Sequence, residues 1–119
     1  MSPPKSAVLL RIYTEEGRMN NHRPLYEDVV LKAREAGLAG ATVLRGPMGY
    51  GAHSKIHTAK ILDLSAKLPL VIEIVDGEDK IRAFLEQLAP MKELGLVTLE
   101  KVEVIHAPGG NHPRSADSV

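Results

Sequence analysis

The sequence predicts an α+β domain whose elements follow the order β-α-β-β-α-β. Residues 7–14 and 68–76 alternate with a period of two between a fully apolar set of side chains and a mixed set, which is typical of strands. Residues 24–36 and a segment that follows Asp76 repeat apolar side chains at helical spacing. A glycine-rich stretch over residues 46–55 separates the second predicted strand from the third. These patterns place one helix between the first and second strands and the other helix between the third and fourth strands.

The first half of the chain contains a strand, a helix and a second strand. A polar connection over residues 15–23 follows the first strand. Pro24 suits the first turn of the helix at 24–36, because an N–H at that position has no intrahelical partner. Gly37 suits the position after the last turn, where the left-handed conformation is common. A short second strand is predicted over residues 41–45.

The second half begins with an irregular stretch. Three glycines and a proline within residues 46–51 exclude the interior of a helix or strand, and residues 56–66 fit either a helix or an extended chain. After the strand at 68–76, Asp76 is expected to cap the second helix. Pro90 either ends that helix or kinks it into one more turn. The final strand region is predicted over residues 96–105.

This order of elements predicts the split βαβ arrangement called ferredoxin-like, with both helices on one face of an antiparallel sheet. The opposite face has no cover within the chain, although its strands carry apolar side chains, so we expect it to be buried against another subunit. Residues 7–106 form the predicted domain. Residues 1–6 are an N-terminal tail, and residues 107–119 are predicted to be disordered because they contain almost no apolar side chains.

The composition argues against several classes of function. Fifteen basic and fifteen acidic residues balance, so no basic excess favours nucleic-acid binding. The chain has no cysteine, which excludes disulfides and thiolate chemistry. No apolar run approaches the ~18–20 residues that cross a bilayer, and no signal-peptide pattern occurs at the N-terminus, so we expect a cytoplasmic protein without membrane insertion.

A candidate anion site lies in the glycine-rich stretch. Successive glycines let backbone N–H groups turn inward into an anion-binding nest, and neighbouring basic side chains add charge-assisted bonds to phosphate. The alternative is a flexible turn in which the glycines only permit the bend. The stretch is neither a Walker A loop nor a dinucleotide-binding fingerprint. The candidate ligand-binding residues are Arg45, Gly46, Gly49, Gly51, His53, Lys55 and His57.

The histidines suggest a weaker, metal-binding alternative. His53 and His57 are four residues apart, a spacing that places both on one face of a helix. Asp63 is the nearest carboxylate that follows them, and no zincin motif is present. Solvated or loop-packing histidines are therefore the favoured interpretation, and no metal site is predicted.

No catalytic constellation is recognisable in the sequence. Glu73 lies in the middle of a predicted strand and Asp76 at its end, and nothing connects either carboxylate to a nucleophile. Arg11 and Tyr13 lie on the amphipathic side of the first strand, where contact with a neighbouring subunit and a position at the rim of the sheet remain alternatives. We expect a protein without enzymatic activity.

The chain resembles the domain of unknown function 190 family, relatives of the nitrogen-regulatory PII proteins. The resemblance extends over about residues 7–106 and is carried by the blocks at residues 10–13, 24–27, 32–46, 56–59 and 68–76. It implies the same ferredoxin-like fold and a compact homotrimer whose sheets line the centre. It also identifies residues 46–67 as the counterpart of the PII T-loop, which reaches out to dock on partners.

The resemblance further implies a ligand. PII relatives bind ATP, ADP or other adenylyl nucleotides in clefts between subunits, where the T-loop base and a glycine-rich loop after the second helix hold the phosphates. Here that second loop is replaced by residues 90–95, which contain a single glycine. If a nucleotide binds, its phosphates must be held differently.

Together these observations predict a signalling protein that senses a small anionic ligand, an adenine nucleotide, at clefts between subunits. Its long loop is expected to dock on a membrane transporter or a metabolic enzyme. The first alternative is an interaction module that uses the same loop without any ligand. The second is a metal sensor based on His53 and His57.

Overall fold

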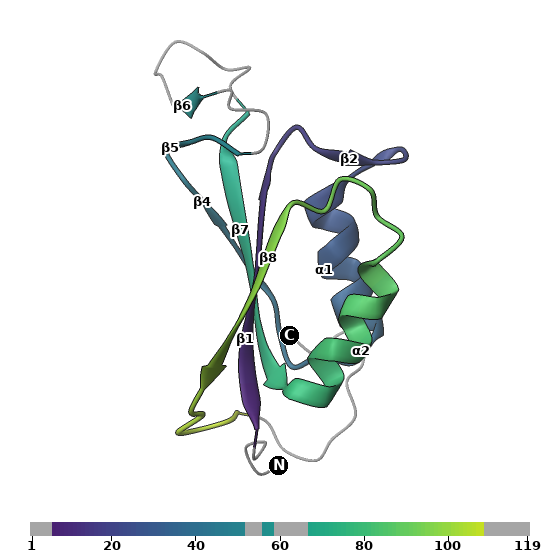
Figure 1. Ribbon diagram of the computed structural model, residues 1–119, viewed down its shortest axis with the longest axis vertical. Coiled ribbons are helices and arrows are strands. Elements are labelled where there is room, and N and C mark those ends of the chain that lie inside the picture. Colours follow the sequence, from purple (N-terminus) through teal and green to yellow (C-terminus); the bar gives the residue numbers. More distant parts are fainter. Residues whose placement is uncertain (1–5, 52–55, 59–66, 109–119) are drawn as a thin grey trace.

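The computed structural model describes residues 6–51, 56–58 and 67–108. A four-stranded antiparallel sheet is formed by β1 (Ala7–Glu15), β4 (Thr42–Arg45), β7 (Pro69–Gly77) and β8 (Leu96–Val102), in the order β4-β7-β1-β8. Both long helices, α1 (Leu25–Glu35) and α2 (Glu78–Leu88), cover the same face of this sheet (Figure 1). The predicted ferredoxin-like α+β fold is therefore confirmed.

Two small strand pairs were not predicted. The polar connection after β1 contains β2 (Met19–Asn20) and β3 (Arg23–Pro24), which pair with each other. Asn21 lies in the turn between them and adopts a positive φ of 58°, a conformation that asparagine tolerates better than most residues. The sequence predicts a loop here, because two-residue strands are too short to show an alternating pattern.

The second pair corrects the prediction for the glycine-rich stretch. β5 (Met48–Gly49) pairs with β6 (His57–Thr58), so part of this stretch is a short strand and the beginning of the ambiguous segment is extended. A strand of two residues needs little intrinsic propensity, because its partner supplies the hydrogen bonds. Residues 59–66 lie outside the described residues.

The ends of α2 differ from the sequence-based expectation. Gly77, rather than Asp76, is the N-cap residue, and no side chain caps the helix. The Asp76 carboxylate instead accepts the N–H of Gly77 at 2.7 Å and the N–H of Ala39 at 2.9 Å. The cap prediction was wrong because β7 continues through Gly77, which places Asp76 one residue too early to reach the helix. At its other end α2 stops at Leu88, so the single turn envisaged beyond Pro90 is not part of it.

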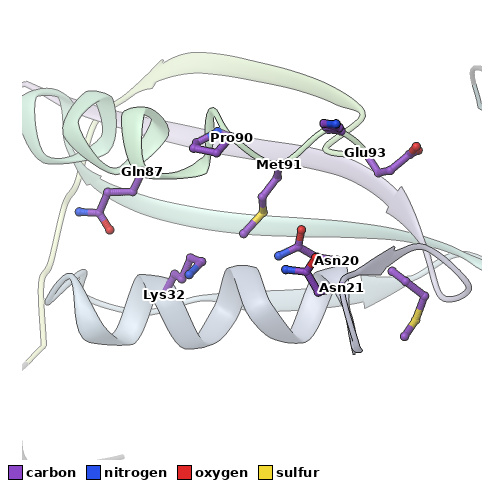
Figure 2. A pocket seen from close by; sticks show the side chains of 9 residues that line it. Asn20, Asn21, Lys32, Gln87, Pro90, Met91 and Glu93 are labelled. Carbon is purple, nitrogen blue, oxygen red and sulfur yellow. The ribbon is translucent and has the colours of Figure 1, made fainter.

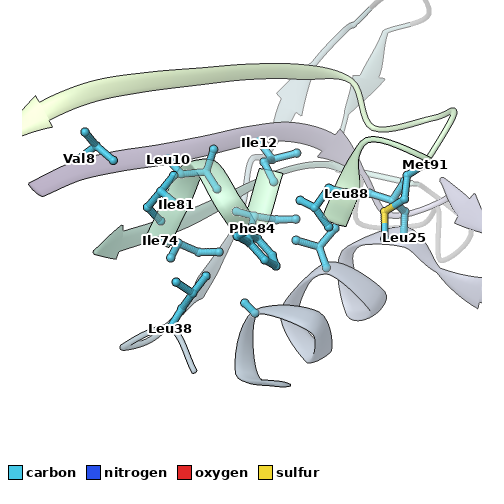
Figure 3. Close-up of a cluster of buried hydrophobic side chains, with 13 residues drawn as sticks. Val8, Leu10, Ile12, Leu25, Leu38, Ile74, Ile81, Phe84, Leu88 and Met91 are labelled. Carbon is cyan, nitrogen blue, oxygen red and sulfur yellow. The ribbon is translucent and has the colours of Figure 1, made fainter. Parts of the chain in front are cut away.

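The core lies between the sheet and the two helices (Figure 3). Alternate β1 residues Val8, Leu10 and Ile12 face the helices and are at most 3% exposed. Phe84 on α2 is the one phenylalanine of the chain and is 1% exposed. No polar or charged residue is buried among the described residues. The helix-covered face of the sheet is thus held by apolar packing.

Gly95 fixes the entry into β8. It has a φ of +88°, and a Cβ at this position would lie 2.3 Å from the carbonyl oxygen of Tyr13. A glycine is required here both by the backbone conformation and by the close approach to β1. The strand then ends at Val102, three residues before the predicted end of the strand region at residue 105.

The opposite face of the sheet has no cover among the described residues (Figure 1). The register places Leu9 beside Val75 and Tyr13 beside Leu96 on this open face. At its centre, Arg11 Nε donates to Glu73 at 2.9 Å and Arg11 Nη1 donates to Glu100 at 3.2 Å. Hydrogen bonding to Glu73 raises the pKa of Arg11 above its ordinary value. The open face therefore combines a charged centre with exposed apolar side chains.

Candidate functional site

A small arm extends beyond the sheet at the end where β4 leaves it and β7 enters it (Figure 1). We define the arm by its described residues, 46–51 and 56–58, which include β5 and β6. In the register of this pair, Met48 lies opposite Thr58 and Gly49 lies opposite His57. The backbone N–H of Gly46 donates to the carbonyl oxygen of Pro69 at 2.8 Å and ties the start of the arm to β7.

The base of the arm is organised by Glu16, which follows β1. Its Oε1 accepts the N–H of Leu68 at 2.9 Å and Nη2 of Arg45 at 3.1 Å. The backbone N–H of Glu16 also donates to the carbonyl oxygen of Leu68 at 2.9 Å. One carboxylate thus links the end of β1 to both chain segments from which the arm departs.

The electrostatics follow from these contacts. The pKa of the Glu16 carboxyl is lowered below its ordinary value, first because the Leu68 N–H donates to the ionised form. Partial burial opposes this shift, and the positive charges of Arg45 and Lys67 reinforce it. Glu16 is therefore an anion at neutral pH. The sequence analysis did not select it, because a glutamate after a strand carries no motif.

Packing explains two of the predicted glycines. A Cβ on Gly46 would lie 3.2 Å from Cγ of Pro69, and a Cβ on Gly49 would lie 3.1 Å from the same atom. The arm crosses the Pro69 ring closely at both positions, which favours residues without a side chain. Gly51 is different, since nothing lies within 4 Å of the position of its Cβ. The N–H of Gly46 is already used by Pro69, so it is not available as an anion donor.

The structure brings some of the predicted site residues together. Arg45, Gly46 and Gly49 gather at the base of the arm, whereas Gly51 lies farther along it and His57 belongs to β6. His53 and Lys55 lie outside the described residues. The arm also exposes three large apolar side chains that the sequence analysis did not select, namely Met48, Tyr50 and Ile56, with exposed fractions of 62%, 71% and 58%.

Comparison with known proteins identifies the family. The DUF190 family, described as "Uncharacterized ACR", matches residues 7–104. The chain belongs to this family. A UPF0166 protein of Aquifex aeolicus is 46% identical over 98 residues, covering 82% of this chain and 92% of the relative. A UPF0166 protein of Methanocaldococcus jannaschii is 33% identical over 99 residues, covering 82% of this chain and 91% of the relative. The predicted family membership is confirmed.

Solved structures support the same fold for this DUF190 protein. CPII from Thiomonas intermedia K12, bound to ADP and bicarbonate, superposes with a TM-score of 0.62 at 21% identity, covering 83% of this chain and 88% of CPII. CPII bound to ADP, AMP and bicarbonate superposes with a TM-score of 0.60 at 20% identity and the same coverage. CPII is described as a nitrogen regulatory PII-like protein, so this DUF190 chain has a PII-like fold.

The other candidate residues have structural partners or lie outside the described part. Glu73 pairs with Arg11 on the open face, and Asp76 binds two backbone N–H groups. Within residues 6–51, 56–58 and 67–108, no group of three or more His, Cys, Asp or Glu residues is placed to hold a metal ion. The same described residues include no helix long and apolar enough to cross a membrane.

Proposed function

We propose that this DUF190 protein is a non-catalytic PII-like signalling protein that senses a small anionic ligand and transmits its presence through the arm. The observation that carries the proposal is the arm itself, which leaves a PII-like sheet between the second and third core strands. The fold likeness to CPII bound to ADP and bicarbonate supports an adenine nucleotide as the ligand.

We place the ligand beside the base of the arm, in a cleft between subunits. The Arg45 side chain is 61% exposed although it contacts Glu16, so its guanidinium has room for a second, anionic partner. Gly51, His53, Lys55 and His57 are the remaining candidates for ligand contacts. Gly46 and Gly49 shape the base of the arm through their contact with Pro69. Ligand binding shifts the population of arm conformations by its differential affinity for them.

We also propose that three copies of the chain assemble through the open face. Tyr13, Leu44, Val75 and Leu96 are between 39% and 63% exposed on this face, which is unusual for a cluster of large apolar side chains on a sheet. Burial against other copies would remove these side chains from water. Light scattering should give about three times the chain mass of 12.9 kDa, and a monomer mass would contradict the assembly.

The ligand proposal is tested by thermal unfolding in the presence of ADP, AMP, bicarbonate, and ADP with bicarbonate. A ligand at 100 times its Kd adds ~2.7 kcal/mol to the stability of the binding state. Arg45→Gln should weaken the stabilisation by an adenine nucleotide. Arg82→Gln is a matched control, because Arg82 lies on α2 and forms an ion pair with Glu78, as Arg45 does with Glu16. An unchanged nucleotide affinity in Arg45→Gln would remove Arg45 from the site.

A second function is favoured by the exposed apolar side chains of the arm. Met48, Tyr50 and Ile56 suit a protein-docking surface, and docking on a transporter or enzyme through them requires no ligand. The replacement of the PII phosphate loop by residues 90–95 also favours this alternative. Binding to a purified partner that needs Tyr50 and is unaffected by any nucleotide would favour the ligand-independent module over the sensor.

A further inference from the structure

A polar pocket of about 530 Å³ lies away from the arm (Figure 2). It is bordered by α1, by the end of α2 with the link to β8, and by the turn between β2 and β3. Its lining residues all belong to one chain: Met19, Asn20, Asn21, Lys32, Gln87, Pro90, Met91, Lys92 and Glu93. The volume falls within the ~300–1,000 Å³ that is typical of small-molecule sites.

The side chains at the pocket come from separate parts of the sequence. Figure 2 shows Lys32 on α1 and Gln87 on α2, with Met91 extending between the two elements. Asn20 and Asn21 come from the hairpin that precedes α1. Met91 is 8% exposed and packs against the core, so this wall of the pocket is anchored to the protein interior.

The pocket carries two positive charges that the described residues leave unpaired. Asp28 lies one helical turn before Lys32, yet its carboxylate accepts Nδ2 of Asn20 at 2.6 Å and lies 3.7 Å from Arg23. Glu93 follows Lys92 directly, but its carboxylate is paired with Arg18. The carboxylates of Asp28 and Glu93 are therefore engaged elsewhere. The ammonium groups of Lys32 and Lys92 have no hydrogen bond or ion pair within the described part of the chain.

The remaining lining completes a recognition surface. The side-chain amides of Asn21 and Gln87 have no protein partner among the described residues, so they are available to hydrogen-bond a ligand. Met19, Pro90 and Met91 supply apolar contact area next to these polar groups. The Arg18–Glu93 ion pair joins the residue before the hairpin to the α2–β8 link at the border of the pocket.

We propose that this pocket is a second ligand site, which binds a small organic anion carrying a phosphate or carboxylate group. The ammonium groups of Lys32 and Lys92 neutralise the anion, the amides of Asn21 and Gln87 orient it, and the methionines contact its carbon skeleton. The pocket is formed within one chain and contains no residue of the arm, although four of its lining residues belong to the link at residues 90–95 that replaces the PII phosphate loop.

The first test is a titration of the ¹⁵N-labelled protein followed by NMR, at constant ionic strength. The probes are inorganic phosphate, glycerol 3-phosphate, succinate and citrate, with glycerol as the neutral counterpart of glycerol 3-phosphate. At least one anion should shift the side-chain amide signals of Asn21 and Gln87 in a saturable manner, and glycerol should not. Comparison of the phosphate and carboxylate probes then identifies the anionic group. The absence of a shift with every anion, or shifts confined to the arm, would overturn the proposal.

The second test removes the two charges. The double variant Lys32→Gln with Lys92→Gln should raise the Kd of the tightest-binding anion at least tenfold. The matched control, Lys80→Gln with Lys101→Gln, removes the same charge outside the pocket and should change the Kd by less than twofold. The side chains of Lys32 and Lys92 have no hydrogen bond or ion pair within the described residues, whereas Lys80 Nζ donates to the carbonyl oxygen of Gly37 at 3.5 Å. The pocket variant should therefore unfold at a midpoint no lower than that of the control. Equal affinity of the pocket variant and the wild type would contradict the site.

Discussion

The two faces of the central sheet are built on different principles. On the face under the helices, Leu10 and its neighbours are fully buried and no polar group interrupts the packing. On the open face, Leu9 lies one residue away but shares its surface with the Arg11–Glu73–Glu100 charge cluster. One face is therefore buried within the chain, whereas the other leaves large apolar side chains exposed, which is why we propose that it is the assembly surface.

The largest effect on unfolding is expected from Leu10→Ala. Leu10 is 0% exposed, and truncating a buried leucine costs about 2–5 kcal/mol through lost burial and the cavity left behind. Chemical denaturation at several protein concentrations should show this loss at each of them. A loss below about 1 kcal/mol would mean that the helix-covered face is packed less tightly than described.

The adjacent substitution Leu9→Ala sharpens the comparison, because it truncates the same residue type on the other face of the same strand. We expect a smaller loss of stability in the dissociated chain and a weaker trimer. Analytical ultracentrifugation should detect dissociation at higher protein concentration than in the wild type. If Leu9→Ala assembled as strongly as the wild type, the open face would not be the assembly surface.

A smaller effect is expected from Arg11→Gln, which breaks the charge cluster. Both ion pairs of Arg11 are partly exposed to solvent, so they contribute less than a buried leucine and are screened by salt. The variant should lose stability at low ionic strength and approach the wild type at high ionic strength. The matched variant Arg82→Gln breaks an exposed pair on α2 and reports the effect of an ordinary surface ion pair.

The smallest effect is expected from Glu16→Gln, which changes how the free energy of unfolding depends on pH. Its pKa is lowered in the folded protein, so its contribution is present above the unfolded pKa of about 4.3 and is lost as the pH falls through the lower folded pKa. Denaturation between pH 7 and pH 3 should therefore show a shallower acid loss in Glu16→Gln than in the wild type. Identical slopes would indicate that Leu68 and Arg45 do not stabilise the carboxylate.

Much of the fold could be predicted because its signals are local. The alternation in β1 and β7, Pro24 before α1 and the stripe of α2 each occur within a short stretch of sequence. The β2–β3 hairpin and β5 could not be predicted, because pairs of two-residue strands exist only through their partners. The prediction that Asp76 caps α2 was wrong because pairing with β1 extends β7 to Gly77, which is the N-cap residue.

The candidate site was less predictable than the fold. Arg45 and the glycines were selected from the sequence, yet the contact of Gly46 and Gly49 with Pro69 joins residues about twenty positions apart. Glu16 was missed because its role depends on Leu68 and Arg45, which are distant in the sequence. The pocket around Lys32 and Lys92 has no sequence motif, since it depends on which carboxylates are already paired.

The sequence by itself determined the order of the elements, the faces of the longest strands and the family, because periodicity and short motifs are read along the chain. The tertiary structure decided which charges are paired and which remain free. Asp28 turns to Asn20 and Arg23 rather than to Lys32, and Glu93 turns to Arg18. Such choices depend on distances between elements that are far apart in sequence, and only the folded arrangement sets those distances.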